Sequence, residues 1–166
     1  NSLPKLIKGP DIFIDTVLLI KRYVKNIFVI ITGKSRHYVI KRLKEIDVPF
    51  IYLNADNAEY RAKLYNILDL YLITSREEGG PKGFLESLSC QTPVISTNVG
   101  QINDLGIDKK NCFKIDSFNP EDLFSKFKFL YKLKNKKNLY KNMLKTAKEN
   151  SVEATIPKWK LFFEDF

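Results

Sequence analysis

The sequence predicts an α/β fold, a doubly wound parallel sheet, on the basis of three observations. Short apolar segments alternate with amphipathic segments of helical periodicity along most of the chain. The apolar segments are continuous and rich in β-branched residues, as in Ile27–Gly33, which is typical of strands covered on both faces. With 166 residues, 44% of them hydrophobic, the chain is long enough for one ordinary domain with its own core.

Each expected element follows from this periodicity and from the turn residues around it. Pro10 suits the first position of a helix, where the missing N–H is not needed. Strands joined through helices form right-handed crossovers, so the loops after the strands should meet at the carboxyl edge of the sheet, where ligands bind. These loops begin after Gly33, Asn54, Ser75 and Asn98. The expected elements are a helix over 10–24, a strand over 27–33, a helix over 35–46, a strand over 49–54, a helix over 57–68, a strand over 69–75, a helix over 83–90, a strand over 93–98, a short helix or turn over 101–105, a weak strand over 112–115 and two lysine-rich helices split around Asn135.

Cysteine and histidine usage argues against disulfide-rich and metal-binding classes of protein. Cys90 and Cys112 are too few for a disulfide framework and lack the spacing of metal ligands, so we expect reduced, partly buried residues of a cytoplasmic protein. His37 has no suitable partner nearby, and we expect no metal or other cofactor. No apolar run reaches the roughly 20 residues that span a bilayer, and no signal peptide is visible, so a soluble chain is expected.

The net charge of +9 is concentrated in one segment, residues 126–148, which contains nine lysines and no acidic residue. A solvated helix face is the favoured interpretation, and attraction to anionic lipid or nucleic acid is the alternative. Aromatic residues within the segment have helical spacing and are expected to belong to the core. They are Phe127, Phe129, Tyr131 and Tyr140.

A glycine-rich turn, residues 76–83, precedes the helix expected over 83–90. The first N–H groups of that helix have no partner within the helix and carry partial positive charge, so they can hold an anion such as a phosphate. Glycines at 79, 80 and 83 would let a ligand approach the backbone, and Lys82 would add a cation.

Carboxylates around this turn would repel a phosphate unless each binds hydroxyl groups, as the diols of a nucleotide sugar would allow. Glu86 could then hold the ribose, and Glu78 could hold the transferred sugar. The alternative needs no ligand, because a glutamate in the first helical turn complements the helix dipole and glycine-rich loops follow many strands.

The run LYNILDLYLITSREEGGPKGFLESLSCQTPVISTNVGQINDL, residues 64–105, resembles the C-terminal, donor-binding domain of retaining GT-B glycosyltransferases of the group 1 or family 4 type. Its hallmark is a pair of glutamates eight positions apart, here Glu78 and Glu86. Ser75, Pro93 and Val99-Gly100 also match the family pattern. The resemblance implies a Rossmann-like domain, one half of a GT-B fold.

The resemblance also implies the site residues. Lys8, in a Lys-Gly pair, would contact the diphosphate, and the segment from Tyr52 to Asn57 would lie against the base. Glu78 would position the sugar, while Lys8, Lys82 and the helix start would stabilise the departing diphosphate without a metal. The expected catalytic residues are Glu78 and Lys82, and the expected donor-binding residues are Lys8, Gly9, Tyr52, Asn54, Gly79, Gly80, Gly83, Phe84, Leu85 and Glu86.

Several positions depart from the family pattern. Pro81 removes one backbone donor, for which Lys82 would compensate, and Gln91 replaces a glycine that usually ends the helix. The family's first strand, with its phosphate-binding arginine, should precede Lys8, and residues 1–7 are a poor substitute for it. We therefore expect residues 1–166 to be a donor-binding fragment that lacks an N-terminal acceptor domain.

The expected function is transfer of a sugar, with retention, from a nucleoside diphosphate to a glycan or lipid-linked acceptor in cell-envelope polysaccharide or glycolipid synthesis. The isolated domain should bind the donor weakly and turn nothing over, and its C-terminal helix should expose Trp159, Phe162 and Phe163. A cytoplasmic location, peripheral to the inner face of the plasma membrane, fits the lysines, and no nucleic-acid partner is expected. The alternatives are a non-catalytic nucleotide-binding module and a protein that binds polyanions or membrane surfaces.

Overall fold

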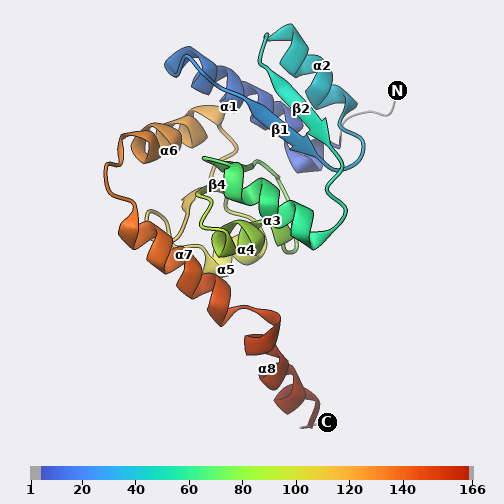
Figure 1. The fold of residues 1–166 in the computed structure, drawn as a ribbon, viewed down its shortest axis with the longest axis vertical. Helices are drawn as coiled ribbons and strands as arrows, with labels where there is room; N and C mark the ends of the chain where they lie inside the picture. Colours follow the sequence, from blue (N-terminus) through green and yellow to red (C-terminus); the bar gives the residue numbers. More distant parts are fainter. Residues whose placement is uncertain (1–4, 165–166) are drawn as a thin grey trace.

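The computed structural model describes residues 5–164 of the chain (Figure 1). Two ends of the chain lie outside the described residues. They are residues 1–4, which belong to the segment compared with the family's first strand, and residues 165–166, the last two positions of the expected C-terminal helix. The elements are η1 (Leu6–Lys8), α1 (Pro10–Tyr23), β1 (Val29–Thr32), α2 (His37–Glu45), β2 (Phe50–Leu53), α3 (Ala58–Ile67), β3 (Tyr71–Ile73), α4 (Lys82–Ser89), β4 (Val94–Thr97), α5 (Gln101–Leu105), β5 (Phe113–Ile115), α6 (Pro120–Lys132), α7 (Lys137–Glu149) and α8 (Val152–Glu164).

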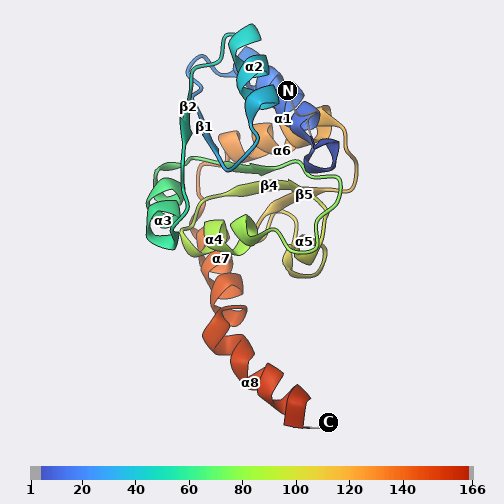
Figure 2. The same ribbon diagram turned by 90° about the vertical axis from the view of Figure 1, so that its right-hand side faces the viewer.

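The predicted α/β class with parallel strands is confirmed, and the described strands form two sheets. One sheet pairs β1 with β2, and the other has the order β3-β4-β5, with every pairing parallel. Helices lie on both sides of β4 and β5: α1 and α6 on one side, and α4, α5 and α7 on the other (Figure 2). This layering is the doubly wound arrangement that the alternation of elements predicted.

Two clusters of buried side chains match the two sheets. The larger cluster surrounds β4, all of whose residues are buried, and includes Phe84, Phe113 and Met143. The smaller cluster joins α1 and α2 to β1 and β2. Leu72, on β3, packs against both clusters and so connects the two sheets through side chains.

The lysine-rich segment forms α6 and α7, as expected, but its aromatic residues divide between core and surface. Phe127 and Tyr140 pack against the larger core cluster. Phe129 and Tyr131 are 45% and 61% exposed, so their expected burial was wrong. Both still contact other rings, Phe129 that of Phe113 and Tyr131 that of Tyr23, because helical spacing brings them to the edge of the core.

The last helix, α8, extends away from the rest of the molecule (Figures 1 and 2). Its aromatic side chains are exposed, as predicted: Trp159 by 60%, Phe162 by 51% and Phe163 by 67%. Among residues 5–164, no helix is both long and apolar enough to cross a membrane.

Candidate functional site

The loop between β3 and α4 carries the first predicted glutamate. Glu78 Oε1 lies 2.6 Å from Lys8 Nζ and accepts a hydrogen bond of 2.8 Å from Ser75 Oγ. The Glu78 side chain is 17% exposed and that of Lys8 is 46% exposed, so a ligand can reach the lysine from solvent. The structure thus brings together residues that are far apart in sequence and that the resemblance assigned to the sugar and to the diphosphate.

The backbone at Gly100 packs tightly against the backbone of Glu78 and Gly79. A Cβ atom at Gly100, whose φ is +50°, would lie 2.4 Å from the carbonyl oxygen of Gly79 and 2.5 Å from that of Glu78. Gln101 continues the contact, because its N–H donates to Gly79 O at 3.2 Å and its side-chain amide donates to Pro81 O at 2.9 Å. The glycine of the Val-Gly pair is therefore required for this close approach.

The three glycines of the turn have different surroundings. Among the described atoms, nothing lies within 4 Å of a Cβ built on Gly79, so this position has room for a ligand. At Gly80 the nearest atoms belong to the amide of Gln101. At Gly83 a Cβ would lie 2.5 Å from the hydroxyl of the partly buried Tyr71, so close packing already requires a glycine here, and its contact with a donor stays a prediction.

The helix α4 begins within the segment 76–83 that was predicted as a glycine-rich turn. The helix begins at Lys82, one residue earlier than predicted, with Pro81 as its N-cap and with no side-chain hydrogen bond to the cap among the described residues. Lys82 is exposed and Leu85 is partly buried, whereas Phe84 is fully buried in the core. Phe84 could therefore meet a ligand only through its backbone, and Lys82 could do so through its ammonium group.

Glu86, on α4, contacts two residues of α3 that the sequence analysis did not identify. Arg61 Nη2 lies 3.2 Å from Glu86 Oε1, and the Tyr65 hydroxyl donates to Glu86 Oε2 at 3.1 Å. Burial, together with the nearby Tyr71 and Glu86, raises the pKa of Tyr65, so its hydroxyl stays protonated and remains a donor. These contacts fix the orientation of the Glu86 carboxylate.

The segment predicted to face a nucleotide base, Tyr52 to Asn57, covers the end of β2 and the loop after it. Tyr52 is exposed and its hydroxyl donates to Gly33 O at 2.8 Å, and the Asn54 side-chain amide donates to Asp56 Oδ2 at 2.5 Å. Arg61 also donates to the carbonyl oxygen of Asp56 at 3.0 Å. One arginine therefore links this segment to Glu86.

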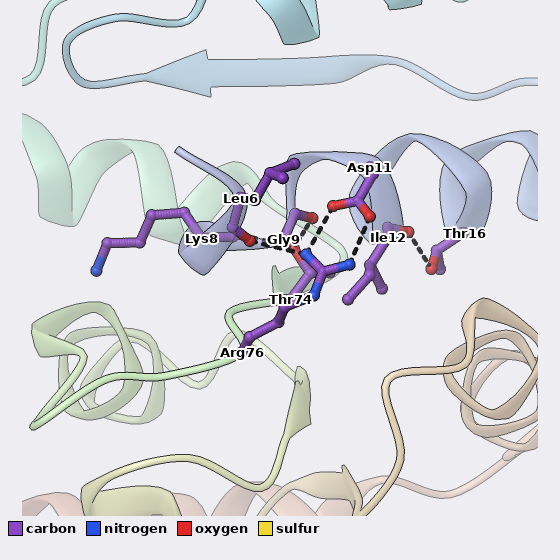
Figure 3. Close-up of polar contacts among 8 residues, drawn as sticks. All are labelled: Leu6, Lys8, Gly9, Asp11, Ile12, Thr16, Thr74 and Arg76. Carbon is purple, nitrogen blue, oxygen red and sulfur yellow. Dashed lines mark hydrogen bonds and ion pairs between the residues drawn. The ribbon is translucent and has the colours of Figure 1, made fainter. Parts of the chain in front are cut away.

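Lys8 is held near the loop by its neighbour Gly9 (Figure 3). Gly9 has a φ of +56°, and a Cβ there would lie 1.8 Å from the carbonyl oxygen of Thr74. The Thr74 hydroxyl donates to Gly9 O at 2.9 Å, and Arg76 forms an ion pair with Asp11. Spacing along the sequence gave no signal for Arg76 or Asp11, because their partners are distant in the chain.

The end of α4 shows how the chain accommodates Gln91 in place of glycine. Gln91 adopts the left-handed conformation itself, with a φ of +57°. Its N–H donates to Leu88 O at 3.1 Å and that of Thr92 donates to Ser87 O at 2.9 Å, the pattern of a Schellman cap. The backbone thus keeps the geometry that a glycine would favour.

Neither cysteine forms a disulfide, since Cys90 and Cys112 are both free thiols. Cys90 is partly buried, as expected, whereas Cys112 is fully buried in the larger core cluster and not partly buried. Within residues 5–164, no three His, Cys, Asp or Glu side chains gather as the ligands of one metal ion would.

Comparison with known proteins assigns these residues to a family. Residues 3–150 match the family model of the glycosyl transferases group 1. An uncharacterized glycosyltransferase of Methanocaldococcus jannaschii is 30% identical over 149 residues, which cover 87% of this chain and 40% of that protein.

Two solved structures share the fold. A glycosyltransferase from Rickettsia africae has a TM-score of 0.84 at 19% identity, with 99% of this chain and 46% of that chain covered. The Anabaena protein HepE, determined in complex with UDP-glucose, has a TM-score of 0.80 at 18% identity, with 99% and 47% covered. The chain therefore spans less than half the length of each of these three proteins.

The family match extends well beyond the glycine turn, to both sheets and to helices α1–α7. The expected resemblance is confirmed at the level of family and fold, and the roles of the individual residues remain predictions. The chain belongs to the glycosyl transferases group 1 family and has the Rossmann-like fold found in GT-B glycosyltransferases.

Proposed function

We propose that this chain binds a nucleoside diphosphate sugar and presents the sugar for transfer with retention of configuration. The observation that carries the proposal is the contact between Lys8 and Glu78, 2.6 Å apart beside the open position of Gly79. A cation for the diphosphate and a carboxylate for sugar hydroxyl groups thus lie together, the carboxylate in the loop that leads into α4. The complex of HepE with UDP-glucose supports a donor of this class.

In this proposal the donor replaces contacts that exist in the free chain. The diphosphate attracts Lys8 and the exposed Lys82, and Lys8 then leaves Glu78 free to accept hydrogen bonds from the sugar. Glu86, held by Arg61 and Tyr65, accepts hydrogen bonds from the ribose. The two lysines and the first N–H groups of α4 stabilise the charge of the departing diphosphate, so the chemistry needs no metal.

Binding is tested by titrating the chain with UDP-, GDP- and ADP-sugars in a calorimeter. Glu78→Gln and Glu86→Gln remove one charge each and keep the side-chain shape, and Glu149→Gln, on the exposed surface of α7, is the matched control. Saturable binding of one nucleotide class is expected, weaker in Glu86→Gln and less selective for the sugar in Glu78→Gln. Absence of binding at millimolar ligand, or equal binding by all variants, would contradict the proposal.

We further propose that the chain is the donor half of a larger enzyme, whose acceptor half completes the active site. Its acceptor would be a glycan or a lipid-linked molecule of cell-envelope polysaccharide or glycolipid synthesis. Donor binding without turnover is therefore expected from this chain alone. The anomeric proton of the donor, followed by NMR, should not change in intensity over hours. Consumption of the donor by the purified chain would show that no second half is needed.

The location proposed is the cytoplasm, with contact to the inner face of the plasma membrane through lysines on α7. The exposed positions include Lys137, Lys141, Lys145 and Lys148, and a polybasic surface attracts anionic lipid. Sedimentation with anionic vesicles should decrease as salt is raised, and neutral vesicles should not sediment the chain. Equal binding to both vesicle types would contradict this part of the proposal, and binding to duplex DNA of equal strength would favour a general polyanion-binding protein.

A further inference from the structure

The segment before α1 crosses the end of β3, where Thr74 and Arg76 hold it (Figure 3). Arg76 makes three kinds of contact with this segment and the first turn of α1. Its N–H donates to Ile7 O at 2.8 Å, and its Nη1 donates to Leu6 O at 2.7 Å. Nη1 and Nη2 also meet Asp11 Oδ1 and Oδ2 at 2.8 and 2.5 Å.

The contact between Arg76 and Asp11 is bidentate, so it fixes the relative orientation of the two side chains as well as the distance between them. Two parallel N–H···O bonds require the planar fork of a guanidinium, and a lysine cannot make them. Each side chain is 35% exposed, so solvent screens the charge and the geometry is the larger contribution of the pair. The pair therefore holds the start of α1 in one orientation relative to the end of β3.

Thr74 fixes the same segment at a second point. Its hydroxyl donates to Gly9 O at 2.9 Å, and its carbonyl oxygen occupies the space that a side chain at residue 9 would need. Lys8 thus lies between anchored residues on both sides, with Leu6 and Ile7 before it and Gly9 after it.

The anchoring residues Thr74 and Arg76 are close to Glu78 in the sequence. One residue separates Arg76 from Glu78, and the Ser75 hydroxyl donates a hydrogen bond to the Glu78 carboxylate. Residues 74–76 therefore fix both the segment that carries Lys8 and the loop that carries Glu78. In Figure 3 the ammonium group of Lys8 points away from the Arg76 guanidinium, so Arg76 acts on the lysine through the backbone.

We propose that Arg76 and Asp11 are positioning residues for the donor, which set the distance between the diphosphate contact at Lys8 and the sugar contact at Glu78. This inference rests on the proposed function and deepens it. A ligand that bridges Lys8 and Glu78 depends on that distance, and a ligand without the second phosphate does not. A displacement of about 1 Å in such a constellation can cost as much as a hundredfold.

The test compares ligands of increasing length. Wild-type chain, Arg76→Gln, Arg76→Lys and Asp11→Asn are titrated with UMP, UDP and UDP-glucose, or with the guanosine or adenosine series if the wild type prefers it. Arg22→Gln, which removes an exposed arginine from α1, is the matched control. Thermal melts followed by circular dichroism report whether each variant is folded.

We expect UMP to bind all variants within about twofold of the wild type, because neither residue reaches the nucleoside contacts at Glu86. The gain in affinity from UMP to UDP, and from UDP to UDP-glucose, should fall by about tenfold in Arg76→Gln and Asp11→Asn. Arg76→Lys should show the same loss, because it keeps the charge without the fork. Arg22→Gln should bind all three ligands like the wild type.

Different results overturn different statements. A folded Arg76→Gln or Asp11→Asn that keeps the full gain from UMP to UDP-glucose would overturn the positioning role. An equal loss for all three ligands, with a lower melting temperature, would also overturn it, because it would indicate a role in stability alone. Absence of binding by the wild type to every nucleotide would instead overturn the proposed function, and the inference with it.

Discussion

Arg61 and Glu86 form an ion pair, with Nη2 and Oε1 3.2 Å apart, that joins α3 to α4. The two side chains are 33% and 32% exposed, so the attraction is partly screened by solvent. Arg61 also holds the carbonyl oxygen of Asp56, in the segment proposed to face the base. The pair therefore connects the two places where we propose that one nucleoside is held.

The first prediction concerns this connection. Arg61→Gln should weaken nucleotide binding by about fivefold, because both Glu86 and the 55–56 segment lose an orienting partner. Lys63→Gln, on the same helix and paired with the exposed Glu59, should have no effect. Calorimetric titration measures both variants. Tighter binding by Arg61→Gln would show that the arginine competes with the ribose for Glu86.

The second prediction compares two glycines. Gly9→Ala should destabilise the fold by about 3 kcal/mol or more, because the new Cβ meets the Thr74 carbonyl and the residue has a positive φ. Gly79→Ala should leave the free energy of unfolding unchanged, since its Cβ would meet open space, yet it should weaken donor binding. Urea unfolding and nucleotide titration separate the two effects. Unchanged donor binding by Gly79→Ala would remove this glycine from the site.

The third prediction uses the cap of α4. Gln91→Gly should stabilise the fold by about 0.5–1 kcal/mol, because glycine adopts the left-handed conformation without strain, although it has more freedom to lose on folding. The Gln91 side chain is exposed, so little packing is lost. Ser89→Gly, inside the same helix, should have the opposite sign. Urea midpoints at constant slope measure both changes, and a destabilised Gln91→Gly would contradict the argument.

The fourth prediction is a pH dependence. The hydrogen bond from Arg76 lowers the pKa of Asp11 below its ordinary value of 3.8. A lowered carboxyl pKa adds stability above the unfolded value, and this stability is lost as pH falls through the folded value. Wild type should therefore melt at a higher temperature than Asp11→Asn at pH 6. This difference should vanish once the pH falls well below 3.8, where the Asp11 carboxyl is protonated. A constant difference across this range would exclude the linkage.

The fifth prediction concerns thiol reactivity. Burial raises the pKa of Cys112 to about 12, and burial together with Glu86 raises the pKa of Cys90. Since the thiolate is the reactive form, both thiols should react slowly with a disulfide reagent at pH 8, and both should react at once after unfolding. Rapid reaction of one thiol in the folded chain would identify it by mass spectrometry and would contradict its burial.

Local patterns explain which parts of this structure were predictable. The order of helices and strands follows from periodicity, which depends on neighbouring residues, and Pro10 and Gly100 match backbone positions that suit them. The partners of Glu86 and Asp11 lie 25 and 65 residues away, so no spacing reveals Arg61 or Arg76. The packing of the Tyr71 hydroxyl against Gly83 could not be predicted either, because nothing in the sequence places the two residues together. The division into two sheets depends on pairings between distant strands in the same way.

The exposed position of α8 determines which part of the chain tryptophan fluorescence reports on. Trp159 is the single tryptophan of the sequence, and its ring lies against that of Phe163 on the same helix, with centroids 6.2 Å apart. Tryptophan emission therefore reports the state of α8 and not that of the sheets, and a fluorescence melt can register fraying of this helix while the core stays folded. The same property makes Trp159 a clean reporter for whatever comes to cover α8, because a blue shift in its emission would arise there and nowhere else in the chain.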